Sequence, residues 1–252
     1  MINLLKARLR QGYRTQAFPP TLNPLPERFR GLPLLHPDRC HQGCRSCADA
    51  CPTGAISANR GLRVDMGRCL FCPCCAEACP HGAVEYTRNY ALASTSREGL
   101  ILSEENPSPK IEALQGEMKR LFGRSLKLRQ VSAGGCNGCE ADLNVLGTVG
   151  FDLGRFGIQF VASPRHADGI VVTGPVTRNM AAALRSTYEA VAAPKLVILS
   201  GTCAISGGTF AGSQAVSGMP ADIPVDLYIP GCPPHPLTVL DGLLRLLGRI
   251  KG

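Results

Sequence analysis

The second half of the chain alternates short apolar segments with amphipathic ones. Five segments rich in branched apolar residues are expected to form strands, over residues 125–132, 158–163, 169–174, 195–200 and 225–230. Three further segments have the spacing of helices, near residues 139–147, 176–191 and 236–249. Apolar strands followed by helices predict an α/β flavodoxin-like domain with a parallel sheet over residues 125–252.

The first half of the chain has shorter and less regular elements. Residues 1–13 are expected to form an amphipathic helix in which apolar and basic residues alternate. Such a helix docks on a membrane or a partner, or packs against its own domain. Residues 14–39 are rich in proline and are expected to form an extended arm. Between Pro109 and Phe122 the apolar spacing predicts a helix, with Ser108 as its N-cap and Gly123 at its end.

Twelve of the thirteen cysteines fall into three sets of four. The first set lies in CHQGCRSCADACP and the second in CLFCPCCAEACP, whereas the third is spread over three loops that follow predicted strands. In chain order the sets are Cys40, Cys44, Cys47 and Cys51; Cys69, Cys72, Cys75 and Cys79; and Cys136, Cys139, Cys203 and Cys232. Four soft thiolates are the ligands that a [4Fe–4S] cluster requires. The sequence therefore predicts three [4Fe–4S] clusters, which in series would carry electrons.

Residues 40–86 contain an internal repeat, because ADACPTGAI and AEACPHGAV each place Gly-Ala and a branched residue shortly after Cys-Pro. In this repeat a tight loop supplies three ligands, and the other half supplies the fourth after a helix. One cluster is therefore expected on Cys40, Cys44, Cys47 and Cys79, and the other on Cys69, Cys72, Cys75 and Cys51. The first loop has one residue more than the usual spacing, between Cys40 and Cys44. Cys74 is expected to be a spare thiol.

The amino-acid composition limits where in the cell the chain is expected to work and which classes of partner it is expected to bind. The chain has 252 residues, 44% of them hydrophobic and 18% charged, which is the profile of a globular protein. The N-terminal residues lack the apolar core of a secretory signal, and no stretch approaches a membrane span, so a reducing, cytoplasmic location is expected. The net charge of +8 would be balanced largely by three clusters of about −2 each. With no Trp and few aromatic residues, a nucleic-acid partner is not expected.

The first half resembles a known family of electron carriers in its cysteine loops and in its lead-in NPLPERFRGLPLL. It is similar over residues 1–95 to the two-cluster ferredoxin-like subunit of complex I and of group 4 membrane-bound [NiFe] hydrogenases, including formate hydrogenlyase. The resemblance implies an α+β ferredoxin-like domain whose N-terminal helix lies against integral membrane subunits. Residues 96–124 would then form a linker and a helix that lead to the second domain.

The second half resembles the cluster-bearing small subunit that complex I and [NiFe] hydrogenases share. Its landmarks are SAGGCNGCE, SPRHADGIVVTGPVT, SGTCAISGG and PGCPPHP. The resemblance implies one [4Fe–4S] cluster on the third cysteine set, facing a large subunit that holds the active site. Complex I has two adjacent cysteines where this chain has Cys136 and Cys139 separated by two residues, so the hydrogenase branch is favoured. Thr173–Thr177 are expected at the large-subunit interface.

These resemblances imply an electron-transfer subunit with no catalytic residue of its own, peripheral on the inner face of the cell membrane. Its partners would be a hydrogenase-like large subunit, integral membrane subunits, and a formate dehydrogenase module or soluble ferredoxin. The alternative in the same class is the equivalent subunit of a nickel-free hydrogenase-related complex or of a complex I-like quinone or ferredoxin oxidoreductase. The alternative from another class is a zinc-loaded structural or nucleic-acid-binding module. Glu140 would contact water or the large subunit, or begin a helix facing solvent. His166 and His235 are expected to form hydrogen bonds or interface contacts.

Overall fold

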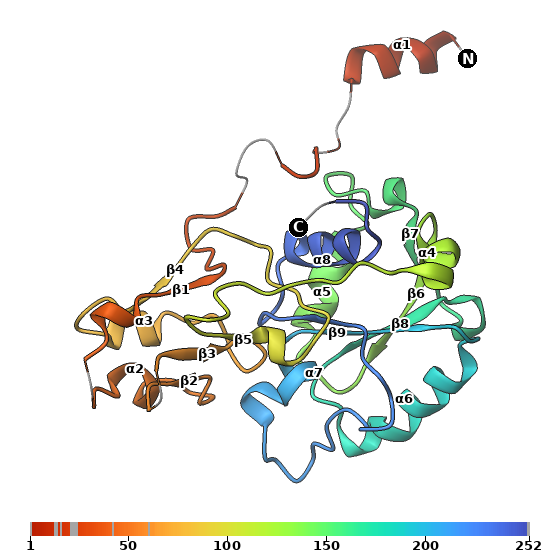
Figure 1. The fold of residues 1–252 in the computed structure, drawn as a ribbon. Helices are drawn as coiled ribbons and strands as arrows, with labels where there is room; N and C mark the ends of the chain where they lie inside the picture. Colours follow the sequence, from red (N-terminus) through yellow and green to blue (C-terminus); the bar gives the residue numbers. More distant parts are fainter. Residues whose placement is uncertain are drawn as a thin grey trace.

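The computed structural model describes residues 2–12, 15, 17–20, 25–41, 43–59 and 61–250. Within these residues a helix stands apart at the N-terminus, a small layer of short strands and helices follows, and a larger α/β unit completes the chain (Figure 1). The large unit contains the predicted parallel sheet. Asn23 and Pro24, the first two residues of the lead-in NPLPERFRGLPLL, lie outside the described residues. So do Met1 and Tyr13 of the segment predicted as an N-terminal helix.

The large unit is built on a five-stranded sheet with the strand order β10-β9-β8-β6-β7. All of its neighbouring strands are parallel, with Ser132 opposite Thr173 and Thr173 opposite Ser200 in register. The strands are β6 (Leu126–Ser132), β7 (Ile158–Phe160), β8 (Gly169–Thr173), β9 (Leu196–Ser200) and β10 (Leu227–Ile229). Each lies inside a segment predicted as a strand, so the predicted parallel α/β sheet is confirmed.

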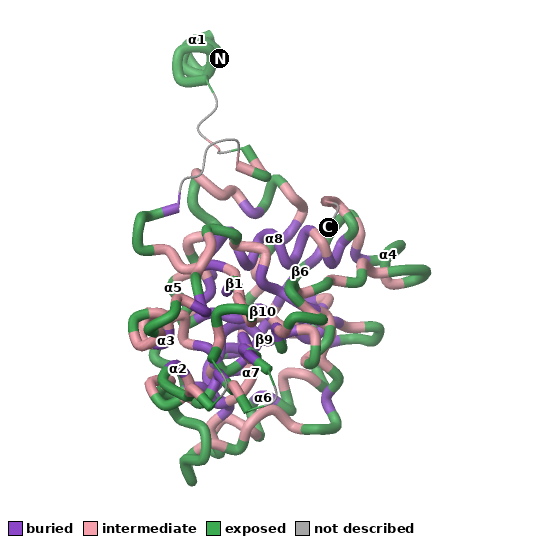
Figure 2. The backbone as a smooth tube through the Cα atoms, turned by 60° about the vertical axis from the view of Figure 1, so that its left-hand side comes forward, coloured by how far each residue is buried: buried purple, intermediate pink, exposed green. Residues whose placement is uncertain are grey.

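Helices cover both faces of this sheet (Figure 1). On one face Val171 and Ile198 pack with α5 (Gly138–Val145) and α8 (Pro236–Leu246). On the other face the alternate residues Val172 and Leu199 pack with α6 (Arg178–Ala190) and α7 (Thr202–Ser206). Because both faces are buried at the centre of the sheet, β8 and β9 are buried throughout and read as largely apolar runs. In Figure 2 most of helix α8 has the colour of buried residues.

Short 3-10 turns connect several of these elements, at Leu153–Phe156, Pro164–His166 and Gly208–Phe210. The carboxyl ends of β6, β9 and β10 lead into the loops that carry the third cysteine set. In an open parallel sheet such loops meet outside the ends of the strands. The sheet therefore fixes where the cysteines of three separate segments converge.

The first half forms two small antiparallel sheets with two short helices. Strand β1 (Pro33–Leu35) pairs with β4 (Val84–Tyr86), and the order β2-β3-β5 joins Ile56–Ser57, Arg63–Asp65 and Ile101–Leu102. Helices α2 (Ser46–Asp49) and α3 (Cys74–Ala78) contact one another, and 3-10 turns occupy Pro37–Arg39 and Glu98–Leu100. Their core of buried aliphatic and cysteine side chains includes Val64, Val84, Cys47 and Cys75.

Helix α1 (Ile2–Gln11) confirms the predicted N-terminal helix, but it does not pack on its own domain. None of its residues is buried, and its apolar side chains Ile2, Leu4, Leu5 and Leu9 are all exposed. Figures 1 and 2 show it standing away from the body of the chain. The predicted extended arm, of which residues 14, 16 and 21–24 lie outside the described residues, contacts the large unit: Phe18 packs on Phe156 at 6.2 Å between ring centroids, and Leu25 is buried.

The helix predicted from Pro109 is shorter than expected. Only α4 (Gly116–Phe122) is helical, with Gln115 at its N-cap and Gly123 directly after it, so Ser108 and Pro109 have no capping role. The preceding residues bond to other segments instead: Thr95 donates its N–H to Lys110, and Leu114 donates to Leu246 at 2.8 Å. Gly116, at φ +52°, is in the left-handed region and separates the two conformations. Ile111 and Leu114 supply the apolar spacing because they pack on the sheet's core from a segment that is not helical.

The segment predicted as a linker is anchored to both halves. Strand β5 lies in it and pairs with β3, and Met66 donates its N–H to Leu100. Just before the predicted linker, Ser94 exchanges two backbone hydrogen bonds with Tyr228 in β10, the edge strand of the large sheet. Asp65 accepts two hydrogen bonds from Arg97, at 2.8 and 2.6 Å, in a partly buried ion pair. The two halves are therefore joined by packed structure as well as by the chain.

Candidate metal centres

The structure brings the third cysteine set together at the carboxyl edge of the large sheet. Cys136 follows β6, Cys139 is the second residue of α5, Cys203 lies in α7, and Cys232 follows β10. Burial is the main cause that raises the pKa of Cys139 to about 12, and the charges of Glu140 and the other three thiols add to it. The pKa of Cys203 is likewise raised to about 11, by burial and then by Cys232 and Cys136. Four thiols from three loops thus lie within electrostatic reach of one another; we call them the third thiol group.

Glycines make room around this group. A Cβ added at Gly201 would lie 2.5 Å from the Sγ of Cys139, and one at Gly208 would lie 2.9 Å from the Sγ of Cys203. Both glycines have positive φ, at +95° and +55°, which a residue with a side chain adopts only with strain. The sequence motifs SGTC and ISGG therefore carry glycine where the backbone must approach a sulfur closely.

The first-half thiols form two groups that exchange their fourth members. Burial and then the charges of Cys79 and Cys40 raise the pKa of Cys47 to about 11. The pKa of Cys40 is likewise raised, by burial and then by the charges of Cys44 and Cys79. We call Cys40, Cys44, Cys47 and Cys79 the first thiol group. Burial raises the pKa of Cys69 to about 12, with smaller effects from Cys75 and Cys51. Cys51, Cys69, Cys72 and Cys75 line one small cavity and are called the second thiol group.

The internal repeat has a matching local geometry in its two halves. Ala55 donates its N–H to the Sγ of Cys51 at 3.2 Å, and Ala83 donates to the Sγ of Cys79 at the same distance. Gly54 and Gly82, at φ +59° and +60°, make the turns between donor and sulfur. Each Cys-Pro-x-Gly-Ala segment therefore points its cysteine across to the loop of the other half with a backbone hydrogen bond on the sulfur.

Cys74 stands outside the two groups. Its thiol interacts with Cys72, and its pKa is raised first by that hydrogen bond and then by the Cys72 charge. Cys75, in contrast, is buried, interacts with both Cys72 and Cys51, and lies 3.3 Å from the hydroxyl of Tyr86. The hydroxyl of Tyr86 also lies 3.7 Å from the Sγ of Cys69. Sequence reasoning missed Tyr86, because the matching segment of the first repeat has no aromatic residue.

The other predicted site residues have mixed outcomes. Glu140 is 5% exposed, so it does not begin a helix that faces solvent. Its Oε1 accepts hydrogen bonds from Ser132 at 2.6 Å and Thr173 at 2.7 Å. His235 caps α8, where its Nδ1 accepts the N–H of Leu237, and it packs on Phe29. His166 is exposed, and residues 173–176 of the segment predicted at an interface are buried.

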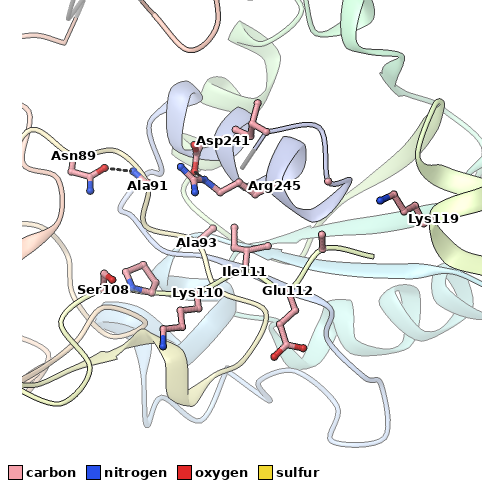
Figure 3. Close-up of a pocket in the computed structure, with 14 residues that line it drawn as sticks. Asn89, Ala91, Ala93, Ser108, Lys110, Ile111, Glu112, Lys119, Asp241 and Arg245 are labelled. Atoms are coloured by element: carbon pink, nitrogen blue, oxygen red, sulfur yellow. Dashed lines mark hydrogen bonds and ion pairs between the residues drawn. The ribbon is translucent and has the colours of Figure 1, made fainter. Parts of the chain in front are cut away.

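One large cavity lies apart from all of these thiols. It measures about 850 Å³ and is formed by α8, the chain near Ala91 and the chain near Lys110 (Figure 3). Its charged residues include Asp241, Arg245 and Lys119, and no cysteine lines it. A smaller cavity of about 390 Å³ contains Cys72 and Cys232, so the second and third thiol groups open onto a common space. Within the described residues, no three His, Cys, Asp or Glu side chains are arranged to hold a single metal ion.

Comparison with known proteins gives the class of this chain. Residues 136–246 match the family model described as NADH ubiquinone oxidoreductase, 20 kDa subunit. The probable membrane-bound hydrogenase subunit mbhJ of Pyrococcus furiosus is 36% identical over 151 residues, which are 59% of this chain and 90% of that protein. Formate hydrogenlyase subunit 7 of Escherichia coli is 39% identical over 142 residues, or 56% of each chain. An NADH-quinone oxidoreductase subunit of Citrifermentans bemidjiense is 46% identical over 112 residues, covering 44% of this chain and 66% of that one.

The parallel sheet, the cysteine-bearing loops at its carboxyl edge and these relatives define a subunit of an oxidoreductase complex. The chain belongs to the NADH ubiquinone oxidoreductase 20 kDa subunit family. The match to the family model begins at Cys136, so the first two cysteine sets lie outside it. No helix among the described residues has both the length and the apolar character needed to cross a membrane.

Proposed function

We propose that this chain relays electrons through three [4Fe–4S] clusters, as a subunit of a membrane-associated complex of the group 4 [NiFe] hydrogenase class. The observation that carries the proposal is the arrangement of twelve cysteines as three groups of four, in each of which every thiol interacts electrostatically with at least one other member. Two of the groups exchange a member across an internal repeat, as a two-cluster ferredoxin domain fused before the family domain requires.

The donor set and its surroundings fit iron–sulfur clusters. Thiolate is the soft ligand that such clusters use, and hydrogen bonds to sulfur tune their potential. Backbone N–H groups already point at the Sγ atoms of Cys51, Cys79 and Cys69, at 3.2, 3.2 and 3.3 Å. Gly201 and Gly208 leave space beside the sulfurs of the third thiol group. When bound, the clusters supply the one-electron redox chemistry, and the chain positions them and excludes water.

The exposed surfaces suit large partners on two sides. Cys136 and Cys232 are exposed at the carboxyl edge of the sheet, where a hydrogenase-like large subunit would cover the third thiol group. Helix α1 presents four exposed apolar side chains among basic ones, which suits integral membrane subunits and the inner face of the cell membrane. Electrons would enter from a formate dehydrogenase module or a soluble ferredoxin.

A second candidate function also has an observation in its favour. The NADH-quinone oxidoreductase relative from Citrifermentans bemidjiense is 46% identical over the region it shares with this chain. A nickel-free, complex I-like complex with a quinone or another carrier as partner would use the same thiol groups. The spacing of Cys136 and Cys139 favours the hydrogenase class between the two.

Two measurements test the proposal. Anaerobic reconstitution of the full chain should yield about twelve iron and twelve sulfide per chain, at four of each per cluster. A reproducible value near eight would remove one thiol group from the proposal, and binding of zinc with no broad absorption near 400 nm would overturn the electron-relay function. In the purified complex, nickel on a partner chain and hydrogen evolution from reduced viologen are expected. Three intact clusters without either would assign the chain to the nickel-free class.

A further inference from the structure

The loops of the second and third thiol groups meet at one buried side chain, that of Thr202. Its hydroxyl donates a hydrogen bond to the carbonyl oxygen of Cys69 at 2.7 Å and also lies 3.1 Å from the carbonyl oxygen of Gly231. Its backbone N–H donates to the same Gly231 oxygen at 2.9 Å. Thr202 is 0% exposed, so these bonds are shielded from water. It therefore touches a residue of the second thiol group while it directly precedes Cys203 of the third.

The two halves pack closely around this contact. A Cβ added at Gly67 would lie 2.8 Å from the Cγ2 of Ile205, so the chain that leads to Cys69 runs directly against α7. Ile205 also packs on a cluster of fully buried first-half side chains that includes Met66 and Leu100. Side chains packed to this density hold their neighbours in fixed positions. The distance between Cys69 and Thr202 is thus set by the surrounding core as well as by the hydrogen bond.

We propose that Thr202 is the positioning residue for electron transfer between the second and third clusters, through the hydrogen bond from its hydroxyl to Cys69. The inference rests on the proposed function, because it requires clusters on both thiol groups. Electrons tunnel more readily through covalent and hydrogen bonds than across gaps between atoms. The route from Cys69 to Cys203 needs one hydrogen bond, and the remaining steps follow the covalent chain of Thr202 and Cys203.

Substitutions at Thr202 can separate the effect of the hydroxyl's hydrogen bond from the effect of side-chain packing. Without it, the buried carbonyl of Cys69 would lose a hydrogen bond that water cannot replace. Thr202→Val keeps the shape of the side chain and removes the donor, whereas Thr202→Ser keeps the donor and removes a methyl group. Thr238 offers a matched control, because it is 1% exposed, lines the cavity that contains Cys72 and Cys232, and its hydroxyl has no hydrogen-bond partner.

The experiment uses the purified complex that contains the full chain. A ruthenium photoreductant is tethered in place of the exposed His41, beside the first thiol group, and a laser flash starts electron transfer. Freeze-quench EPR then follows the reduction of each cluster with time. Iron and sulfide content and the EPR signal of each reduced cluster are recorded for every variant before the flash.

We expect Thr202→Val to retain all clusters and their signals and to slow reduction of the third cluster severalfold, with reduction of the second unchanged. Thr202→Ser should restore the wild-type rate, and Thr238→Val should match wild type. A wild-type rate in Thr202→Val would overturn the inference, and so would failure of Thr202→Ser to restore it or equal slowing in Thr238→Val. If Thr202→Val does not load its clusters, the Thr202→Ser and Thr202→Ala rates decide the matter, since only the serine should transfer normally. Absence of cluster signals in the wild-type chain would instead refute the proposed function itself.

Discussion

Gly201 gives the sharpest test of the third thiol group, because its replacement disturbs one sulfur and little else. The residue precedes α7, with φ +95° and ψ 150°, a conformation that is nearly restricted to glycine. In Gly201→Ala the backbone strain should lower the free energy of unfolding by about 1–3 kcal/mol. That is well within the stability of an ordinary domain, at about 5–15 kcal/mol, so the variant should still fold.

The larger effect is expected at the sulfur. The new Cβ would lie 2.5 Å from the Sγ of Cys139, where atoms in contact are normally about 3.5 Å apart or more. The sulfur must therefore move by roughly 1 Å, whereas a ligand constellation tolerates displacements of about 0.5 Å. After anaerobic reconstitution, Gly201→Ala should hold about eight iron and eight sulfide per chain, at four per remaining cluster. EPR should show the two first-half clusters and lack the third.

Gly212→Ala is the matched control for this experiment. Gly212 also has a left-handed backbone, at φ +82°, but an added Cβ would meet nothing within 4 Å. It should lose a similar free energy of unfolding in a urea titration and keep about twelve iron, as three four-iron clusters. If Gly201→Ala also keeps twelve iron and the third EPR signal, Cys139 is not held where the structure has it or is not a ligand.

Three further outcomes are expected. In the metal-free chain, the free energy of unfolding should fall as the pH rises above about 9. Burial raises the pKa of Cys69 and Cys139 to about 12 from an ordinary 9.0, so the unfolded chain releases these protons first. Urea titrations at several pH values check this, and a free energy of unfolding that does not change with pH would contradict it. Cys74→Ser should leave iron content unchanged and Cys75→Ser should lose the second cluster; the reverse result in iron analysis and EPR would move the ligand by one residue. Arg97→Ala should destabilise the chain by about 2 kcal/mol, since it breaks a partly buried double hydrogen bond to Asp65. The exposed ion pair between Arg185 and Asp222 is the control. Arg185→Ala should lie within about 1 kcal/mol of the wild-type free energy of unfolding in the same denaturation assay. Equal losses in the two variants would refute the argument from burial.

The central strands β8 and β9 could be predicted from sequence because they are buried on both faces of the sheet. Residues such as Val171 and Val172 point to opposite sides and are both apolar, so the run has no polar interruption. The cysteine spacing carried equally local information about the two loops of the internal repeat. Convergence of Cys203 and Cys232 with Cys136 followed from the rule that loops after parallel strands meet at one edge.

The features that the sequence did not reveal depend on contacts between distant segments. The apolar spacing of Ile111 and Leu114 resembled that of a helix, although their backbone is bonded to other parts of the chain. The hydrogen bond from Thr202 to Cys69 spans 133 residues and has no local signature. The short strand β5 lies in the segment predicted as a linker, because two residues are too few to show a period.

The anchoring of that linker bears on how two halves with different motifs would serve the proposed relay. Electron transfer depends steeply on distance, so a flexible tether between the second and third thiol groups would give a broad range of rates. Here β5 pairs with the first half, Ser94 pairs with Tyr228 of the second, and Leu114 bonds to the end of α8. Successive parts of the connection are thus held by opposite halves, and Arg97 closes the junction onto Asp65. The spacing of the thiol groups is therefore a property of the packed interface, and mutations within that interface should affect electron transfer even where they touch no cysteine.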